Sequence, residues 1–168
     1  TQECTVEVLC SDFEGRYEPI SEVVSTEPDI FSHNLETVRS LTPAIRSSAD
    51  YDRSLMVLEI AKEINPVQIT KSSIMLGLGE TFDEIEEVMD DLRAIDVDII
   101  NIGQYLQPTK GHAAVKKFWH PDEFAELKAL ADKKGFLHCE SGPLVRSSYH
   151  ADDQYQAYLH QKTETIES

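Results

Sequence analysis

The pattern of apolar and polar positions predicts five strands in this chain. The predicted strands are 5–9, 30–34, 70–76, 97–106 and 136–140. Residues 5–9 alternate between apolar and polar, 70–76 are partly β-branched and increasingly apolar, and 97–106 give the clearest signal. Between the strands, apolar residues recur at helical spacing. Strands that alternate with helices predict parallel βα units, whose ligands collect at the carboxyl ends of the strands.

The clearest such unit spans 70–93. Its apolar strand ends in a Gly-Leu-Gly turn at 77–79, and Thr81 with Glu84 then forms the capping box that begins a helix. Because glycine lets the backbone approach a ligand closely, we expect this turn to present free amides to a small molecule. A tight strand-to-helix turn without a ligand is the alternative interpretation.

Residues typical of helix ends predict two further helices. Ser48 or Asp50 begins a helix that ends before Pro66. Pro121 suits the first turn of another helix, and Gly135 follows its last turn.

Polar residues follow each predicted strand, which predicts a ring of hydrogen-bonding groups around one mouth of the fold. Solvated loops are also polar, so each position alone is a weak signal. Asn34 is further expected to cap a short helix that Pro43 ends. The polar positions are Ser11, Asp12, His33, Asn34, Glu80, Gln104, Gln107, Glu140 and Ser141.

Length and charge restrict the function further. With 168 residues, 40% of them hydrophobic, the chain can form one domain with a core. A formal charge of −16 argues against a nucleic-acid partner. No apolar run approaches the roughly 20 residues that span a bilayer. Because the chain opens almost directly in a strand and without Met, we interpret it as part of a longer protein.

The three cysteines, Cys4, Cys10 and Cys139, contain no pair at Cys-x2-Cys spacing. They predict neither a disulfide scaffold nor a self-contained metal site, and they suit a reducing compartment. His33 with Glu36 has the i, i+3 spacing of zinc ligands, but no second histidine stands at a partner's spacing.

Four motifs together resemble lipoyl synthase, a family of radical S-adenosylmethionine enzymes. They are Ile-Phe-Ser-His-Asn-Leu-Glu-Thr-Val at 30–38, Met-Leu-Gly-Leu-Gly-Glu-Thr at 75–81, Gly-Gln-Tyr-Leu-Gln-Pro at 103–108 and Ser-Gly-Pro-Leu-Val-Arg-Ser-Ser-Tyr-His-Ala at 141–151. The resemblance runs from about Val6 to Ala151, with the motifs in the family's order and spacing, and the four in order are highly specific.

The resemblance implies an α/β fold that forms the C-terminal part of a partial (β/α)6, TIM-like barrel with parallel strands. It assigns 1–151 to this barrel. Residues 152–168 are polar and have no sustained apolar face, which predicts a flexible tail. The resemblance also implies two [4Fe–4S] clusters and S-adenosylmethionine as cofactors. The implied reaction inserts two sulfur atoms at C6 and C8 of an octanoyl chain carried by a lipoyl-carrier protein or lipoyl domain. The implied location is the cytoplasm, or the mitochondrion in a eukaryote.

Roles for single residues follow from the same resemblance. Ser148 would be the serine ligand to an iron of the auxiliary cluster, with Arg146 beside it at the catalytic centre, and we expect its hydroxyl near the open ends of the strands. A hard oxygen ligand on thiolate-bound iron is suited to a cluster that is consumed. The cofactor-binding residues would be Asn34, Glu36, Gly77, Gly79 and Glu80, and Gln104 and Gln107 would line the octanoyl channel.

The chain also departs from the family. The two cysteine triplets, Cys-x3-Cys-x2-Cys and Cys-x4-Cys-x5-Cys, are absent, so the missing half of the barrel would have to supply them. We therefore expect this chain alone to bind no complete cluster and to be inactive. Ser73 replaces a usual glycine, and Ser11 a usual proline.

Two other functions fit the pattern less well. One is a non-catalytic half-barrel that keeps a nucleoside pocket or regulates a longer synthase, and the other is a small phosphate-binding α/β enzyme that uses the glycine turn. If the carrier is acidic, it would dock through basic residues such as Lys110, Lys116 and Lys117.

Overall fold

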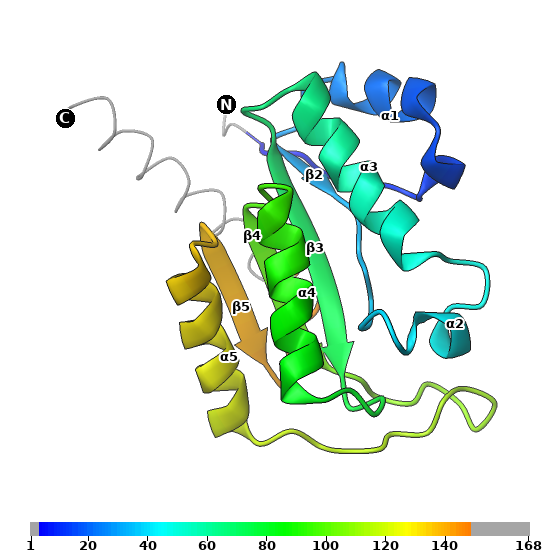
Figure 1. Ribbon diagram of the computed structural model, residues 1–168, viewed down its shortest axis with the longest axis vertical. Helices are drawn as coiled ribbons and strands as arrows, with labels where there is room; N and C mark the ends of the chain where they lie inside the picture. The colour runs from blue at the N-terminus through cyan, green and yellow to red at the C-terminus, as the bar shows by residue number, and fades with distance from the viewer. Residues whose placement is uncertain (1–3, 149–168) are drawn as a thin grey trace.

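The computed structural model describes residues 4–148, which form one parallel five-stranded sheet with helices along one side (Figure 1). Each strand lies beside the next strand of the chain, in the order β1-β2-β3-β4-β5. The predicted α/β fold with five parallel strands is confirmed, and it is consistent with part of a TIM-like barrel. The strands are β1 (Glu7–Leu9), β2 (Ile30–Ser32), β3 (Ile69–Leu76), β4 (Ile99–Gln104) and β5 (His138–Gly142).

Helices fill the connections between the strands. Because right-handed crossovers between sequential parallel strands place the connecting helices on the same side, the helices of residues 4–148 cover one face of the sheet. They are α1 (Tyr17–Val24), α2 (Thr42–Ile45), α3 (Tyr51–Ile64), α4 (Phe82–Ala94) and α5 (Pro121–Lys134), preceded by a 3-10 turn, η1 (Phe13–Gly15).

The two faces of the sheet differ because successive side chains along a strand point to opposite sides. The outer face packs against the helices and forms the main core, which includes Phe31, Ile74 and Ile102. The inner face has only a small apolar cluster of Ile30, Ile69 and Ile99. It also carries charge, since Lys71 of β3 is fully buried and its Nζ lies 2.9 Å from Oε2 of Glu7.

The predicted helix ends are confirmed. Thr81 and Glu84 form the capping box of α4, and Asp50 accepts from the amide of Arg53 at the start of α3. Pro121 lies in the first turn of α5, and Gly135 ends that helix in a left-handed conformation.

The short helix predicted directly after Asn34 is wrong. Glu36 instead pairs with β3: its amide donates to the carbonyl oxygen of Ser73 (2.9 Å), and its own carbonyl accepts from the amide of Met75 (2.9 Å). These bonds satisfy the backbone groups that a helix would otherwise use. Pro43 does not end a helix but lies in the first turn of α2, where its missing N–H costs nothing.

The C-terminal predictions fall partly outside the described residues. Tyr149 to Ala151 of the fourth motif and the predicted tail 152–168 belong to that part of the chain. Within residues 4–148, none of the helices has the length and apolar character needed to cross a bilayer.

Candidate functional site

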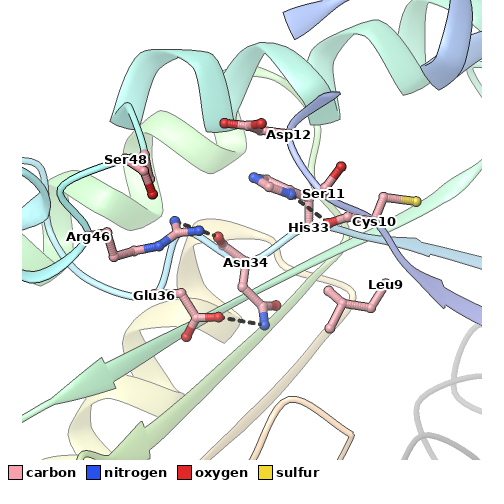
Figure 2. A pocket seen from close by; sticks show the side chains of 10 residues that line it. Leu9, Cys10, Ser11, Asp12, His33, Asn34, Glu36, Arg46 and Ser48 are labelled. Atoms are coloured by element: carbon pink, nitrogen blue, oxygen red, sulfur yellow. Dashed lines mark hydrogen bonds between the residues drawn. The ribbon is translucent and has the colours of Figure 1, made fainter. Parts of the chain in front are cut away.

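A pocket of about 280 Å³ lies at the carboxyl ends of β1 and β2 (Figure 2). Strand ends of parallel sheets commonly hold ligands, and the polar side chains predicted to follow β1 and β2 meet here. The lining residues are Leu9, Cys10, Ser11, Asp12, His33, Asn34, Glu36, Arg46, Ser48 and Ala49.

His33 presents a hydrogen-bond acceptor to this pocket. Its Nδ1 lies 3.0 Å from the carbonyl oxygen of Cys10, so Nδ1 carries the proton and donates. Its Nε2 then keeps a lone pair, which is buried without a partner among the described residues. Burial lowers the pKa of His33, and the bond to Cys10 only partly offsets this. The imidazole is therefore neutral at pH 7, and its Nε2 can accept a hydrogen bond from a ligand.

Asn34 and Glu36 add further acceptors. The amide nitrogen of Asn34 donates to Oε1 of Glu36 (3.1 Å), which leaves Oδ1 of Asn34 buried and unpartnered among the described residues. Glu36 holds its carboxylate in place from a left-handed backbone with φ of 68°. A non-glycine residue in this conformation costs about 1–2 kcal/mol, and such strain often marks functional positions.

Arg46 is the cationic group of the pocket, and no sequence pattern pointed to it. Its Nη1 donates to the carbonyl oxygens of Asn34 and Leu35, both at 3.2 Å. Within residues 4–148, it forms no ion pair with a carboxylate. The nearby Asp12 is already engaged, because its Oδ2 accepts from Nε of Arg53 (2.7 Å). Burial would raise the pKa of Asp12, but the amide of Glu14 and Arg53 outweigh it, and the net shift is downward.

The glycine turn does not present free amides, and that expectation is wrong. The carboxylate of Glu80 folds back and accepts from the amides of Gly77 (2.5 Å), Leu78 (2.9 Å) and Gly79 (3.1 Å). Its Oε1 also accepts from Nε1 of Trp119 (2.8 Å). The turn is thus a closed unit in which a buried anion takes the place that a ligand was expected to take.

Gln104 and Gln107 differ in their surroundings. Gln107 is exposed and donates to the carbonyl oxygen of His112 (2.8 Å). Gln104 is buried, and its side chain bonds to the backbone at the end of β3 and in the loop that follows β4. Its Nε2 donates to the carbonyl oxygens of Leu76 (3.0 Å), Tyr105 (3.1 Å) and Lys117 (3.1 Å), and its Oε1 accepts from the amide of Trp119 (3.0 Å).

After β5 the chain turns back along the inner face of the sheet. A Cβ on Gly103 would lie 2.2 Å from the carbonyl oxygen of Val145, and Nδ2 of Asn101 donates to the carbonyl oxygens of Arg146 and Ser147 (both 3.1 Å). The next residue, Ser148, is exposed, and its expected position near the open ends of the strands stays a prediction.

The described residues do not provide the ligands of a complete iron–sulfur cluster. Residues 4–148 contain no group of three His, Cys, Asp or Glu side chains that could hold a metal ion. Cys4 is exposed, whereas burial raises the pKa of the Cys139 thiol to about 12. Cys10 lines the pocket as a half-buried thiol whose pKa burial also raises.

The structure thus brings together only some of the predicted site residues. Asn34 and Glu36 share one pocket with His33 and Asp12, to which the structure adds Arg46. The other predicted site residues do not line it: Gly77, Gly79, Glu80, Gln104, Gln107, Arg146 and Ser148.

A parallel α/β half-barrel with a polar pocket at its carboxyl edge agrees with the comparison with protein families. Residues 1–92 match the radical SAM superfamily, and the chain belongs to that superfamily.

Within it, the chain is similar to curated lipoyl synthases, which confirms the resemblance seen in the motifs. It is 64% identical over 150 residues to the lipoyl synthase of Bacillus subtilis, which is 89% of this chain and 50% of the relative. The lipoyl synthase of Halalkalibacterium halodurans is 62% identical over 151 residues, 90% of this chain and 50% of the relative. The chain spans about half the length of the curated relatives it matches.

Proposed function

We propose that this chain is the part of a lipoyl synthase that holds S-adenosylmethionine and forms one wall of the substrate site. The proposed reaction is the insertion of two sulfur atoms at C6 and C8 of an octanoyl chain on a lipoyl-carrier protein. The superfamily match and the lipoyl synthase relatives support it. Since both cysteine triplets are absent from the chain, we expect it to be inactive by itself.

The observation that carries the proposal is the hydrogen-bond inventory of the pocket. It offers three acceptors, namely Nε2 of His33, Oδ1 of Asn34 and the carboxylate of Glu36, and one cation, Arg46. A matching ligand brings several N–H or O–H donors and one anionic group, such as a carboxylate. S-adenosylmethionine has both, with its ribose hydroxyls, its ammonium group and its carboxylate. The sulfonium charge also favours the neighbourhood of Glu36.

The volume of the pocket is consistent with a site that encloses only part of the cofactor. About 280 Å³ lies near the lower limit of roughly 300 Å³ for small-molecule sites, so we propose that the missing part of the barrel completes the pocket. Beside a reduced cluster, bound S-adenosylmethionine would supply the radical chemistry that the proposed hydrogen removal requires. The residues described here bind and orient the cofactor.

The glycine turn and the two glutamines have supporting roles in this proposal. Glu80 fixes the turn of Gly77 and Gly79, so that these residues shape the rim near the cofactor through their backbone. Gln104 holds the loop that follows β4. Direct contacts of Gln104 and Gln107 with the octanoyl chain stay a prediction.

The pocket is tested with Glu36→Gly in a protein of the relatives' full length that contains this segment. Glycine relieves the left-handed strain at φ of 68°, so the free energy of unfolding should change by only about 0–1 kcal/mol. Loss of the carboxylate should weaken S-adenosylmethionine binding about 10- to 100-fold, since a hydrogen bond to a charged group contributes about 1.5–3 kcal/mol. Calorimetry on the reconstituted protein measures the affinity.

Glu27→Gly is the matched control. Glu27 is exposed, outside the pocket, and also has a left-handed backbone, with φ of 52°. Glu27→Gly should change the free energy of unfolding as little as Glu36→Gly does, and it should keep the full affinity for S-adenosylmethionine. Equal S-adenosylmethionine affinities for the two variants would remove Glu36 from the proposed site.

We propose further that Ser148, with Arg146 beside it, is the serine ligand of the auxiliary cluster. The exposed position of Ser148 leaves it accessible to a group supplied from outside residues 4–148. In the reconstituted full-length protein, Ser148→Ala should change the spectrum of the auxiliary cluster, whereas Ser147→Ala should not. Identical spectra and equal lipoyl product from both variants would exclude the role.

A further inference from the structure

A long irregular loop crosses the carboxyl edge of the sheet between β4 and α5 (Figure 1). It covers residues 105–120 and contains no helix or strand. Loops of more than about 12–15 residues without secondary structure are uncommon inside compact domains and usually functional. The loop 105–120 lies at the same edge of the sheet as the pocket.

The backbone of this loop is fixed to the sheet from the inside. The hydroxyl of Tyr105 donates to the carbonyl oxygen of Ala113 (2.9 Å). The amide of Lys116 donates to the carbonyl oxygen of Gly77 (2.7 Å). Trp119 is buried and held by Glu80 through its Nε1 (2.8 Å). These contacts order the backbone, so the side chains that point outward are presented without a large ordering cost.

The outward side chains are basic in an otherwise acidic chain. The whole chain has 31 Asp and Glu residues and a formal charge of −16, yet positions 99–121 contain none. Lys110 and Lys116 are exposed and form no side-chain ion pair or hydrogen bond within residues 4–148. Lys117 differs, because its Nζ lies 2.6 Å from Glu123 and 3.5 Å from the ring centre of Trp119.

Apolar groups accompany these charges. Phe118 is 70% exposed and Leu106 is 50% exposed, and large exposed side chains beside charged ones are common where proteins meet. Lys116 also lies beside the glycine turn, with its Cγ 3.8 Å from where a Cβ on Gly79 would stand. A partner on the loop would therefore rest beside the glycine turn, at the same edge of the sheet as the pocket.

We propose that the loop 105–120 docks an acidic protein domain, namely the carrier that delivers the octanoyl chain. This inference rests on the proposed function and adds the surface and charge of the partner. Without Lys110 and Lys116, two acidic proteins would repel each other as they approach. Unpaired cations at the rim instead speed association and select an acidic partner. Leu106 and Phe118 supply apolar contact area in the docked complex.

The test compares Lys110→Glu/Lys116→Glu with Lys133→Glu in a protein of the relatives' full length that carries this segment. Lys133 is exposed, also lacks an ion pair within residues 4–148, and lies at the far end of α5. Two probes are used: an octanoylated lipoyl domain of negative net charge, and a short neutral peptide with one octanoyl-lysine. Circular dichroism verifies that each variant keeps its fold.

The double variant should bind the lipoyl domain on the order of tenfold more weakly at low salt, because two attractions become repulsions. The difference should shrink as salt is added. Binding of the neutral peptide should be unchanged, and Lys133→Glu should behave as the unmodified protein with both probes.

Three other results would contradict the inference in different ways. Equal lipoyl-domain binding by the double variant and the unmodified protein would overturn docking at this loop. Equal weakening for both probes would also overturn it, because the lysines would then act on the octanoyl chain. If the unmodified protein bound neither probe, the proposed function itself would fail, and the docking inference with it.

Discussion

Glu80→Gln tests whether the glycine turn is held by its own carboxylate. Oε1 of Glu80 accepts from Gly77 and Trp119, and Oε2 accepts from Leu78 and Gly79. Glutamine replaces one of these oxygens by an NH2 group, whichever way the amide turns. Two N–H groups then face another donor, and at least one of them is buried, since Gly79 is exposed. Each buried unsatisfied group costs about 1–3 kcal/mol, so the free energy of unfolding should fall by about 1–6 kcal/mol.

Urea unfolding followed by circular dichroism measures this loss. Asp83→Asn is the control, since Asp83 is exposed in the first turn of α4 and its removal should cost about 0.3–1 kcal/mol through the helix dipole. Hydrogen exchange gives a second measurement, because at least one of the amides of Gly77, Leu78 and Gly79 should lose protection in Glu80→Gln and none in Asp83→Asn. A loss no larger than that of Asp83→Asn, with the three amides still protected, would refute the closed turn.

Two further predictions concern His33 and Gly103. Burial lowers the pKa of His33 in the folded state, so the unfolded chain binds the proton more readily, and the free energy of unfolding should decrease as pH falls below about 6.5. Urea titrations between pH 7.5 and 5.5 should show a shallower decrease for His33→Asn, and parallel curves would contradict the assignment. Gly103→Ala should displace the segment at Val145, because a Cβ would stand 2.2 Å from its carbonyl oxygen, at a cost of about 1–3 kcal/mol. Hydrogen exchange at 145–148 should increase in Gly103→Ala but not in Gly111→Ala, whose Cβ would have a single neighbour at 3.7 Å.

The elements that sequence predicted correctly carry their signals locally. The capping box at Thr81 and Glu84 and the Pro121 and Gly135 ends of α5 each depend on residues within a few positions of the helix end. β4 was the clearest strand because its first residues are strongly apolar, as is common in buried parallel strands. The order of the five strands follows from the sequential right-handed crossovers.

The errors have non-local or ambiguous causes. After Asn34 the chain follows β3, and the bonds that hold Glu36 there come from Ser73 and Met75, far along the sequence. The Gly-Leu-Gly turn has the same sequence whether a ligand or Glu80 fills it, so the pattern alone could not separate the two. Arg46 reaches the pocket through the fold of the loop around α2, and no motif marks it.

The buried pair of Lys71 and Glu7 has a consequence for strand alignment. β1 contributes only three residues to the ladder, so few backbone bonds distinguish its position from one displaced by a single residue. Such a displacement would turn Glu7 to the opposite side of the sheet and leave the fully enclosed ammonium of Lys71 uncompensated. At about 3–5 kcal/mol for a buried charge that loses its partner, this one contact excludes the misaligned form and sets where Cys10, Ser11 and Asp12 enter the pocket.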